Sequence, residues 1–392
     1  MKFVDDELAA LERGGRMRRM RAIDGAQDRV VTVDGREVVN FSANDYLGLA
    51  KHPALRDASA SALVDGSGAG ASRLVVGNLR GHRELEASLA RWYGAGRTAL
   101  AFNSGYQANV GVLQALAGRG DEVFSDELNH ASLIDGCRLS RAAVTVYRHR
   151  AVDELAARLE ESRARRKIIV SDSVYSMDGD RAPVARLAEV ARTFDAMLIL
   201  DEAHAVGTIG PAGRGVAADA GVVPDVLVGT LGKAFGSFGA FVLAEERVIR
   251  LLVNRARSFV FTTALPPAVV AASRAAVELA GGAAGDRLRI RLSCNIKQLS
   301  CGLRELGVAD QGFENTAIFP ILVGDDRLAM ECAEQLLERG LYAQGIRPPT
   351  VPSGTARLRV ALTASHTAED IDQLLGALAE LTRLGKVPRH AA

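Results

Sequence analysis

The sequence has little of several features that would point to a specialised class of protein. Its 392 residues include four cysteines and carry a net charge of +1. Without Cys-x-x-Cys spacing, the cysteines predict neither a zinc site nor a disulfide framework, and the charge balance predicts no nucleic acid or membrane partner. No apolar run of membrane-spanning length lacks a charge or proline, and the N-terminus has no signal-peptide core. We therefore expect a cytoplasmic enzyme acting on small molecules.

Lysine is also scarce, with six among 48 basic residues: Lys2, Lys51, Lys167, Lys233, Lys297 and Lys386. Lys233 lies in a glycine-flanked stretch directly after the apolar run 226–230. A desolvated lysine can lose its proton and act as nucleophile or base, whereas arginine stays protonated. An acid and an imidazole, Asp201 and His204, follow another apolar run. Together the three residues favour a catalytic lysine over a solvated loop residue.

Strand-like and helix-like runs alternate through the middle of the chain. The helical runs carry apolar residues at helical spacing, for example Leu85 and Leu89. Such alternation predicts an α/β fold with a mostly parallel sheet covered on both sides. Ligands of these sheets bind beyond the carboxyl ends of the strands, where Asp201, Thr230 and Lys233 would cluster. The expected strands are 98–102, 122–125, 144–147, 168–171, 198–201, 226–230 and 239–244.

The two ends of the chain follow a different pattern. Residues 1–22 predict a charged amphipathic helix, and Asp34-Gly35 between alternating apolar residues predicts a hairpin. Near the C-terminus we expect a smaller α+β unit, with strands 317–323 and 357–362 and helices 327–339 and from 368. The sequence thus predicts an N-terminal helix and hairpin arm (1–45), a large domain (46–285) and a small C-terminal domain (286–392).

The segment Asp201-Glu-Ala-His204 also fits two other classes of site. An acidic box ending in His occurs in nucleotide hydrolases, but these need Gly-x-x-x-x-Gly-Lys-Ser/Thr, and here Ala234 follows Lys233 and position 227 is leucine. A metal site from His130, Asp201 and His204 lacks the usual ligand spacing. Both alternatives are weak, and no metal is expected.

A pyridoxal phosphate site accounts for more of these residues at once. This cofactor needs a lysine for its Schiff base, a carboxylate for its ring nitrogen and anchors for its phosphate. Lys233 and Asp201 supply the first two. The phosphate suits the start of the helix after residues 103–109, where Gly105 and Tyr106 offer backbone N–H groups, and Thr230 can add a hydroxyl. A histidine, His130, is available to stack on the ring.

Several motifs, taken in order, resemble the α-oxoamine synthases over residues 18–385. They are Asn-Asp-Tyr-Leu-Gly (44–48), Ser-Gly-Tyr-Gln-Ala-Asn (104–109), Asn-His-Ala-Ser (129–132), Ser-Met-Asp-Gly-Asp (176–180), Asp-Glu-Ala-His (201–204), Thr-Leu-Gly-Lys-Ala-Phe-Gly (230–236) and Arg-Pro-Pro-Thr-Val-Pro (347–352). The resemblance implies a homodimer of the pyridoxal phosphate-dependent transferase fold type I, with a large domain and a smaller C-terminal one.

The resemblance also implies roles for individual residues. Lys233 carries the cofactor, Asp201 pairs with its ring nitrogen, and His130 stacks on the ring and serves in catalysis. The other implied cofactor contacts are Gly105, Tyr106, Ser176, His204, Thr230 and, across the dimer, Thr263. Besides His130, the implied substrate contacts are Arg18, Asn44, Thr350 and Arg359, with Arg359 holding the amino-acid carboxylate.

The reaction implied by the resemblance is a decarboxylating condensation of an amino acid with an acyl thioester. The motifs are most similar to the branch that joins L-alanine to a pimeloyl group in biotin synthesis. Whether the pimeloyl group arrives on coenzyme A or on acyl carrier protein stays open. So do sister activities such as glycine C-acetyltransferase, 5-aminolevulinate synthase and serine palmitoyltransferase. A catalytically silent partner subunit is disfavoured because Lys233 and Asp201 are present.

Overall fold

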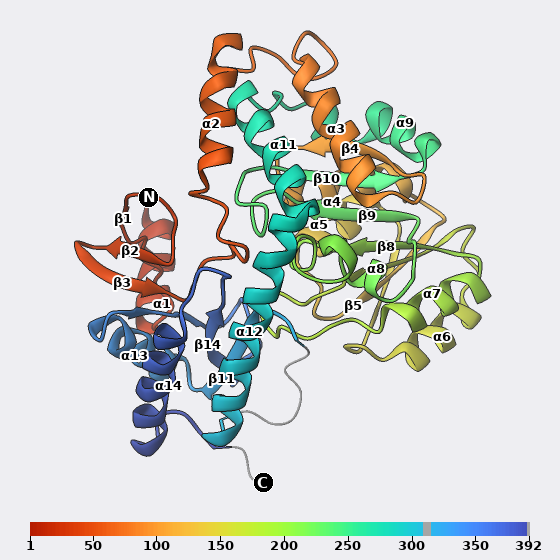
Figure 1. Cartoon of the computed structure of the whole chain (residues 1–392). Helices are drawn as coiled ribbons and strands as arrows, with labels where there is room; N and C mark the ends of the chain where they lie inside the picture. Colours follow the sequence, from red (N-terminus) through yellow and green to blue (C-terminus); the bar gives the residue numbers. More distant parts are fainter. Residues whose placement is uncertain (309–314, 390–392) are drawn as a thin grey trace. The chain divides into compact units, whose positions relative to one another are not determined.

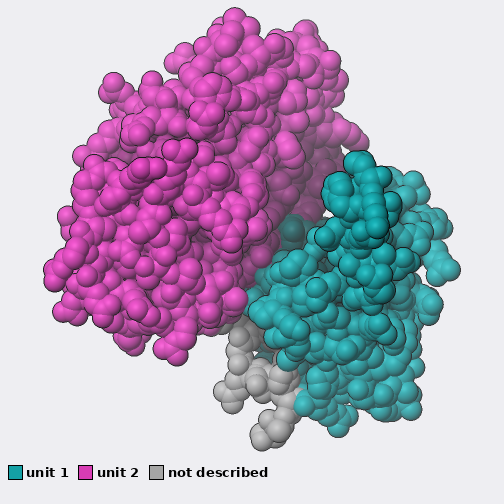
Figure 2. Space-filling view, turned by 180° about the vertical axis from the view of Figure 1, so that it is seen from behind, with its two compact units in different colours: residues 1–44, 177–179, 291–392 teal, residues 45–176, 180–290 magenta. Residues whose placement is uncertain are grey.

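The computed structural model describes residues 1–308 and 315–389, and its chain divides into two compact units. Unit 1 comprises Met1–Asn44, Met177–Gly179 and Arg291–Ala392, and unit 2 comprises Asp45–Ser176 and Asp180–Ile290. Figure 2 draws unit 1 in teal and unit 2 in magenta. Within the described residues, no helix combines the length and apolar character needed to span a membrane.

Unit 2 is built on one large sheet (Figure 1). In spatial order its strands are β4 (Thr98–Phe102), β10 (Ala240–Ala244), β9 (Val226–Thr230), β8 (Ala196–Asp201), β7 (Lys167–Asp172), β5 (Glu122–Asp126) and β6 (Ala143–Tyr147). The pairs from β9 to β6 are parallel, so the predicted mostly parallel sheet is confirmed. Strand β10 is the exception, because it runs antiparallel to both β4 and β9.

Both faces of this sheet are buried. Alternate strand residues such as Val170 and Val228 belong to an apolar cluster with side chains of the helices on one face. Their strand neighbours, for example Ile169 and Leu227, point to the opposite face and are also buried. This double burial explains why the strands read as continuous apolar runs rather than alternating ones.

Helices of unit 2 precede, separate and follow the strands of the large sheet along the chain. The predicted apolar stripe is confirmed in α3, where Leu85 and Leu89 are buried. The helices are α2 (Pro53–Ala62), α3 (Arg80–Tyr93), α4 (Gly105–Leu116), α5 (Ala131–Ser140), α6 (Val152–Glu161), α7 (Val184–Thr193), α8 (Val216–Asp219), α9 (Glu246–Arg255), α10 (Arg257–Val260) and α11 (Pro267–Gly281), with short 3-10 turns at Leu63–Asp65 and Pro211–Gly213. Helix α12 (Ala283–Glu305) follows α11.

Unit 1 contains two smaller sheets. One has the order β1 (Ile23–Asp24), β2 (Val30–Val33), β3 (Arg36–Asn40) and β12 (Leu341–Tyr342), and the other β11 (Ile318–Gly324), β14 (Ala356–Ala361) and β13 (Gln344–Ile346). The remaining helices are α1 (Lys2–Arg13), α13 (Asp326–Glu338) and α14 (Ala368–Arg383). Because β3 pairs with β12, the N-terminal hairpin shares a sheet with the C-terminal part of the chain.

The N-terminal arm confirms one local prediction and corrects another. The hairpin between β2 and β3 turns at Asp34 and Gly35, both with positive φ (49° and 81°), as a tight two-residue turn requires. The first helix ends at Arg13 rather than near residue 22. The two glycines that follow it explain the early end, since Gly15 adopts a left-handed φ of 62°.

Candidate functional site

Three side chains form a relay beside the end of β9. Lys233 Nζ lies 2.7 Å from His204 Nε2, and the Tyr46 hydroxyl lies 2.6 Å from His204 Nδ1. A protonated Lys233 amine can donate to Nε2, which leaves the proton of the imidazole on Nδ1 to face Tyr46. The loop geometry depends on Gly236, whose φ is 62° and where a Cβ would come within 2.3 Å of the Ala50 nitrogen. The half-buried lysine is therefore held in one place by its loop and its imidazole partner.

Asp201 is the last residue of β8 and is buried. Its Oδ2 accepts a hydrogen bond from Asn109 Nδ2 at 2.6 Å, and its Oδ1 accepts one from the Ala203 N–H at 2.8 Å. Asn109, on α4, also donates to Ser132, while its own buried Oδ1 has no hydrogen-bond partner among the residues that the structure describes. These donors are neutral, so the carboxylate is oriented by them without being neutralised. It can thus still attract a cationic ring N–H.

A second carboxyl group lies next to Asp201. Asp172 ends β7, and its Cα is paired with that of Asp201 across the parallel strands. Burial, and then the charge of Asp201, raise the pKa of Asp172 well above its usual range, which favours the neutral acid. Asp172 Oδ2 accepts the His130 backbone N–H at 2.6 Å. Asp172 therefore fixes the residue that carries the predicted stacking ring.

His130 caps the first turn of α5. Its Nδ1 accepts the Ser132 N–H at 3.2 Å and lies 2.8 Å from the Ser132 hydroxyl. Solvent reaches the ring, yet burial still lowers its pKa; the charge of Asp201 opposes this effect and that of Lys233 adds to it. The neutral imidazole is the form that favours stacking on an electron-poor ring.

The other predicted cofactor contacts also lie in unit 2. Gly105 and Tyr106 begin α4, where backbone N–H groups have no partner within the helix and favour an anion. The Tyr106 hydroxyl itself donates to Asp135. The Thr230 hydroxyl donates to the Gly239 carbonyl at 3.1 Å and accepts the Gly232 N–H, so it already shapes the lysine loop.

Two further predicted contacts, Thr263 and Ser176, are residues of unit 2 that lie on irregular backbone. The exposed Thr263 accepts the Asn103 amide at its carbonyl, 2.7 Å away. Ser176 lies on the 173–182 segment, which follows β7.

Apart from His130, the predicted substrate residues lie in unit 1. Arg359, on β14, donates to Asn44 Oδ1 at 3.0 Å. Arg18 donates to the Thr350 hydroxyl at 3.3 Å. Arg347 donates to the Met17 carbonyl at 2.6 Å and so braces the 347–352 loop against the N-terminal arm. The structure thus brings these residues together in pairs within their unit.

Glu202 is the second acid of the segment that also fitted a nucleotide hydrolase. It is fully buried, accepts the Val216 and Ala217 N–H groups at 2.9 and 2.7 Å, and accepts the Ser173 hydroxyl. Burial outweighs these bonds and raises its pKa to about 7. Glu202 thus holds the start of α8 through its carboxyl group. Across residues 1–308 and 315–389, no cluster of three metal-ligating side chains is found.

Three residues of the site carry no role in the sequence analysis: Tyr46, Asn109 and Asp172. Asp172 shares the strand-end position of Asp201, so the same rule could have found it. Asn109 lies four residues after Gly105 and therefore on the same side of α4. Tyr46 gives no signal of this kind, because only the fold brings residue 46 to residue 204.

Comparisons with known proteins give a family for the chain. The model of the family described as aminotransferase class I and II matches residues 36–378. The 8-amino-7-oxononanoate synthase of Anaeromyxobacter dehalogenans strain 2CP-1 is 50% identical over 382 residues, covering 97% of this chain and 95% of that protein. The enzyme of the same name from Geobacter sulfurreducens is 49% identical, covering 98% of each.

Solved structures give the same fold. Serine palmitoyltransferase from S. paucimobilis, determined with a PLP-myriocin adduct, has a TM-score of 0.91 and 32% identity over 97% of both chains. The Francisella tularensis 8-amino-7-oxononanoate synthase has a TM-score of 0.77 and 26% identity, covering 89% of this chain and 99% of that one. The predicted fold type I architecture is thereby confirmed.

Proposed function

The chain belongs to the class I and II aminotransferase family and, within it, to the 8-amino-7-oxononanoate synthases, and from this we propose its substrates and the roles of its residues. It is a pyridoxal phosphate-dependent acyltransferase of biotin biosynthesis. The proposed reaction joins L-alanine to a pimeloyl thioester, on coenzyme A or acyl carrier protein, and yields 8-amino-7-oxononanoate, carbon dioxide and the free thiol carrier. The observation that carries this proposal is the 50% identity to a synthase of that name over nearly the whole chain.

The residues of unit 2 fit pyridoxal phosphate. This cofactor supplies an aldehyde for covalent attachment and a protonated ring that withdraws electrons from the bound amino acid. Lys233 would carry it, the N-terminus of α4 would hold its phosphate, and Asp201 would keep its ring nitrogen protonated. The Oδ1 of Asn109 is buried beside Asp201 without a hydrogen-bond partner in the described part of the chain, which supports a ligand at this point.

Side chains of unit 2 would carry out the proton transfers of the reaction. Lys233 Nζ would remove and return the proton at the alanine Cα, and its 2.7 Å contact with His204 Nε2 gives that proton a neighbouring acceptor. Tyr46 keeps the imidazole oriented through Nδ1. His130, neutral because burial lowers its pKa, would cover the ring without repelling a cationic nitrogen.

The arginines of unit 1 suit the carboxylates of the substrates. Arg359, buried in a strand and oriented by Asn44, would pair with the alanine carboxylate in a bidentate manner. Arg18, next to Thr350, would pair with the distal carboxylate of the pimeloyl chain. Arg347 is already used to brace its loop, which favours Arg18 over Arg347 for this role.

A substrate panel tests the proposed specificity. Alanine, glycine and serine are each offered with pimeloyl, acetyl, succinyl and palmitoyl coenzyme A, and thiol release is followed. We expect alanine with pimeloyl coenzyme A to give the highest kcat/KM, because Arg18 can pair with a distal carboxylate that acetyl and palmitoyl groups lack and that the shorter succinyl group carries much nearer the thioester. A higher value for glycine with acetyl coenzyme A would overturn the substrate proposal and leave the family and cofactor in place.

We also propose that the enzyme is a homodimer and acts in the cytoplasm, where its four free cysteines would stay reduced. Ser72 pairs with Thr263, which places the exposed apolar Val75 and Val76 on a loop joined to the segment of exposed Phe261. Apolar side chains gathered in this way favour burial in a subunit interface. Thr263 would then reach the cofactor phosphate of the partner subunit.

Mixed dimers test the shared site. Lys233→Ala subunits and Thr263→Ala subunits, each of low activity alone, are mixed and allowed to exchange. A shared site predicts recovery of about a quarter of the wild-type activity in an equal mixture, because random exchange makes about half of the dimers mixed and one of the two sites in each mixed dimer has both residues intact. Tagged subunits verify that mixed dimers form. Verified mixed dimers without recovered activity would contradict the proposal.

A further inference from the structure

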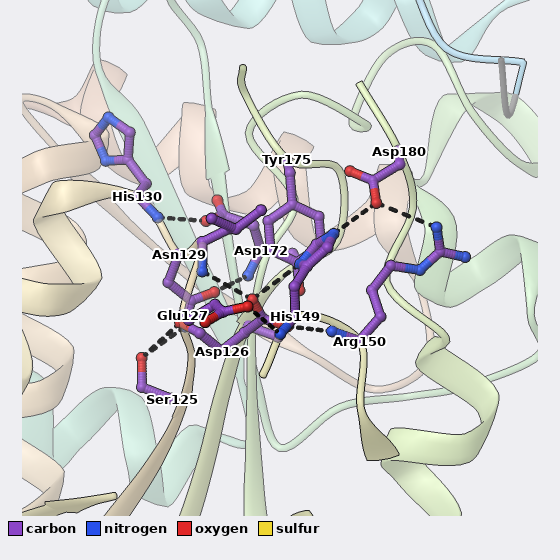
Figure 3. A network of polar contacts seen from close by, with 12 residues as sticks. Ser125, Asp126, Glu127, Asn129, His130, His149, Arg150, Asp172, Tyr175 and Asp180 are labelled. Carbon is purple, nitrogen blue, oxygen red and sulfur yellow. Dashed lines mark hydrogen bonds and ion pairs between the residues drawn. The ribbon is translucent and has the colours of Figure 1, made fainter. Parts of the chain in front are cut away.

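A polar network outside the cofactor contacts surrounds His149 (Figure 3). His149 lies just after β6, and its Nδ1 is 3.0 Å from Oδ1 of Asp126, the last residue of the neighbouring strand β5. Its Nε2 is 2.7 Å from Asp180 Oδ2 on the 173–182 segment. Since both partners are carboxylates, both ring nitrogens donate, and the ring is an imidazolium. We call these three residues the His149 bridge.

One end of the bridge fixes the turn that leads to His130. Asp126 Oδ1 also accepts the Leu128 N–H at 2.9 Å, and its backbone carbonyl accepts the Asn129 N–H. Asn129 is buried and donates to the Val170 carbonyl at 2.9 Å. His130 follows directly, with its N–H on Asp172. The hydrogen bonds of this short turn thus make the position of His130 depend on that of Asp126.

The other end fixes the segment that carries Ser176. The Tyr175 N–H donates to the Asp180 carbonyl at 3.0 Å, and Val174 pairs with Arg181, so the 173–182 segment doubles back on itself. The ring of Tyr175 meets that of His149 edge to face, with centroids 4.4 Å apart. Tyr175 and Asp180 therefore form the base of a loop. Ser176, which follows Tyr175 directly, is the first residue of that loop.

We propose that His149 is a positioning residue of this enzyme, whose imidazole ties the turn bearing His130 to the segment bearing Ser176. The proposal rests on the proposed function only in taking these two residues as cofactor contacts. Both lie on irregular backbone after strand ends, where the sheet alone does not fix them. A charged ring held by two carboxylates supplies a rigid link between them.

The charges around the bridge support a protonated ring. Burial lowers the pKa of His149, but the hydrogen bonds and charges of Asp126 and Asp180 outweigh it and raise that pKa to about 9. The other groups facing the bridge are Arg150, which pairs with Asp180 at 3.1 Å, Glu127, which accepts the His149 N–H, and Tyr175. Burial raises the pKa of Tyr175 far beyond the range in which it would ionise.

Two substitutions separate the halves of the bridge. His149→Asn places an amide donor near the position of Nδ1 and keeps the bond to Asp126, whereas His149→Gln places one near Nε2 and keeps the bond to Asp180. Because positioning needs both bonds, each variant is expected to lower kcat about tenfold with little change in KM for alanine. Each is also expected to weaken pyridoxal phosphate binding to the apoprotein and to speed deuterium exchange in both 126–132 and 173–182.

The controls make the outcome decisive. Arg148, on the same loop as His149, forms an ion pair with Glu154 of α6, and Arg148→Ala, which removes this pair, is expected to leave all three measurements unchanged. Asp180→Asn removes the partner at the more exposed end, so it tests the bridge if the His149 variants fold poorly. Combined with His149→Gln it is expected to add no further loss, since either change alone already breaks the connection between the two segments. The proposal would be overturned if either His149 variant kept the wild-type kcat, cofactor affinity and exchange rates. Additive losses in the double variant would overturn it as well.

The pH dependence gives an independent readout. Since the folded-state pKa of about 9 exceeds the ordinary value of 6.5, the stabilisation is complete below pH 6.5 and is lost as the pH rises through 9. The unfolding temperature of the wild type should therefore exceed that of His149→Gln most at low pH, and the two should converge near pH 10. A gap that stays constant across this range would contradict the charged bridge. Deuterium exchange and pyridoxal phosphate affinity test the positioning role of His149 even if the substrate panel contradicts the proposed substrates.

Discussion

Replacement of Lys233 by alanine is expected to lower kcat by roughly three or more orders of magnitude, because the variant loses both the covalent holder of the cofactor and the base at the alanine Cα. The wild-type protein should be yellow. Borohydride reduction followed by peptide mapping should place the pyridoxyl mass on Lys233, which lies 2.7 Å from His204. In the variant the mass should be absent from this peptide.

A matched control for this experiment is Lys297→Ala, on α12 of the same chain. It removes a lysine that is distant from the site in sequence and has no assigned role, so activity and labelling should stay at the wild-type level. A pyridoxyl label on any other lysine of the wild-type protein, or substantial turnover by the Lys233 variant, would refute the assignment.

Replacement of Asp201 by asparagine is expected to leave pyridoxal phosphate bound but to lower kcat roughly a hundredfold or more, since the ring nitrogen would lose the anion that keeps it protonated. The shape of the side chain is kept, and the amide oxygen can still accept the Asn109 or Ala203 hydrogen bond. The loss should therefore appear in kcat, and cofactor content measured by absorbance should stay near one per site.

Asp172→Asn is the informative comparison for this variant. Because the pKa of Asp172 is raised and the residue is neutral, its amide replacement changes no charge, and the loss of activity should be much smaller. Near-normal turnover of Asp201→Asn, or an equal loss in both variants, would contradict the assignment of Asp201 as the electrostatic partner of the ring.

The sequence was informative where local pattern and a general rule of sheets act together. Apolar runs predicted the strands of unit 2, and the rule that ligands bind beyond strand ends singled out Asp201 and Thr230, which end β8 and β9. Capping and turn chemistry likewise gave the Asp34-Gly35 hairpin. The roles of single residues in cofactor and substrate binding stay predictions, supported by geometry and resemblance.

The features that the sequence did not predict depend on contacts between residues far apart in the chain. The antiparallel direction of β10 leaves no trace in its composition, since a doubly buried strand reads the same in either direction. The Tyr46 contact with His204 joins positions far apart in the chain. The His149 bridge joins three separate segments, each of which alone reads as a polar loop after a strand.

The pairing of β3 with β12 has a consequence for how the chain folds during synthesis. Val39 pairs with Leu341, and Arg29 forms an ion pair with Asp370 on α14, so the N-terminal arm finds its partners only when nearly all of the chain has left the ribosome. In unit 2, β4 likewise waits for β10. Both sets of contacts are of long range, which slows folding and leaves strand edges exposed meanwhile. The N-terminal arm is thus translated first but forms its contacts last. Truncation at the C-terminus would remove those contacts.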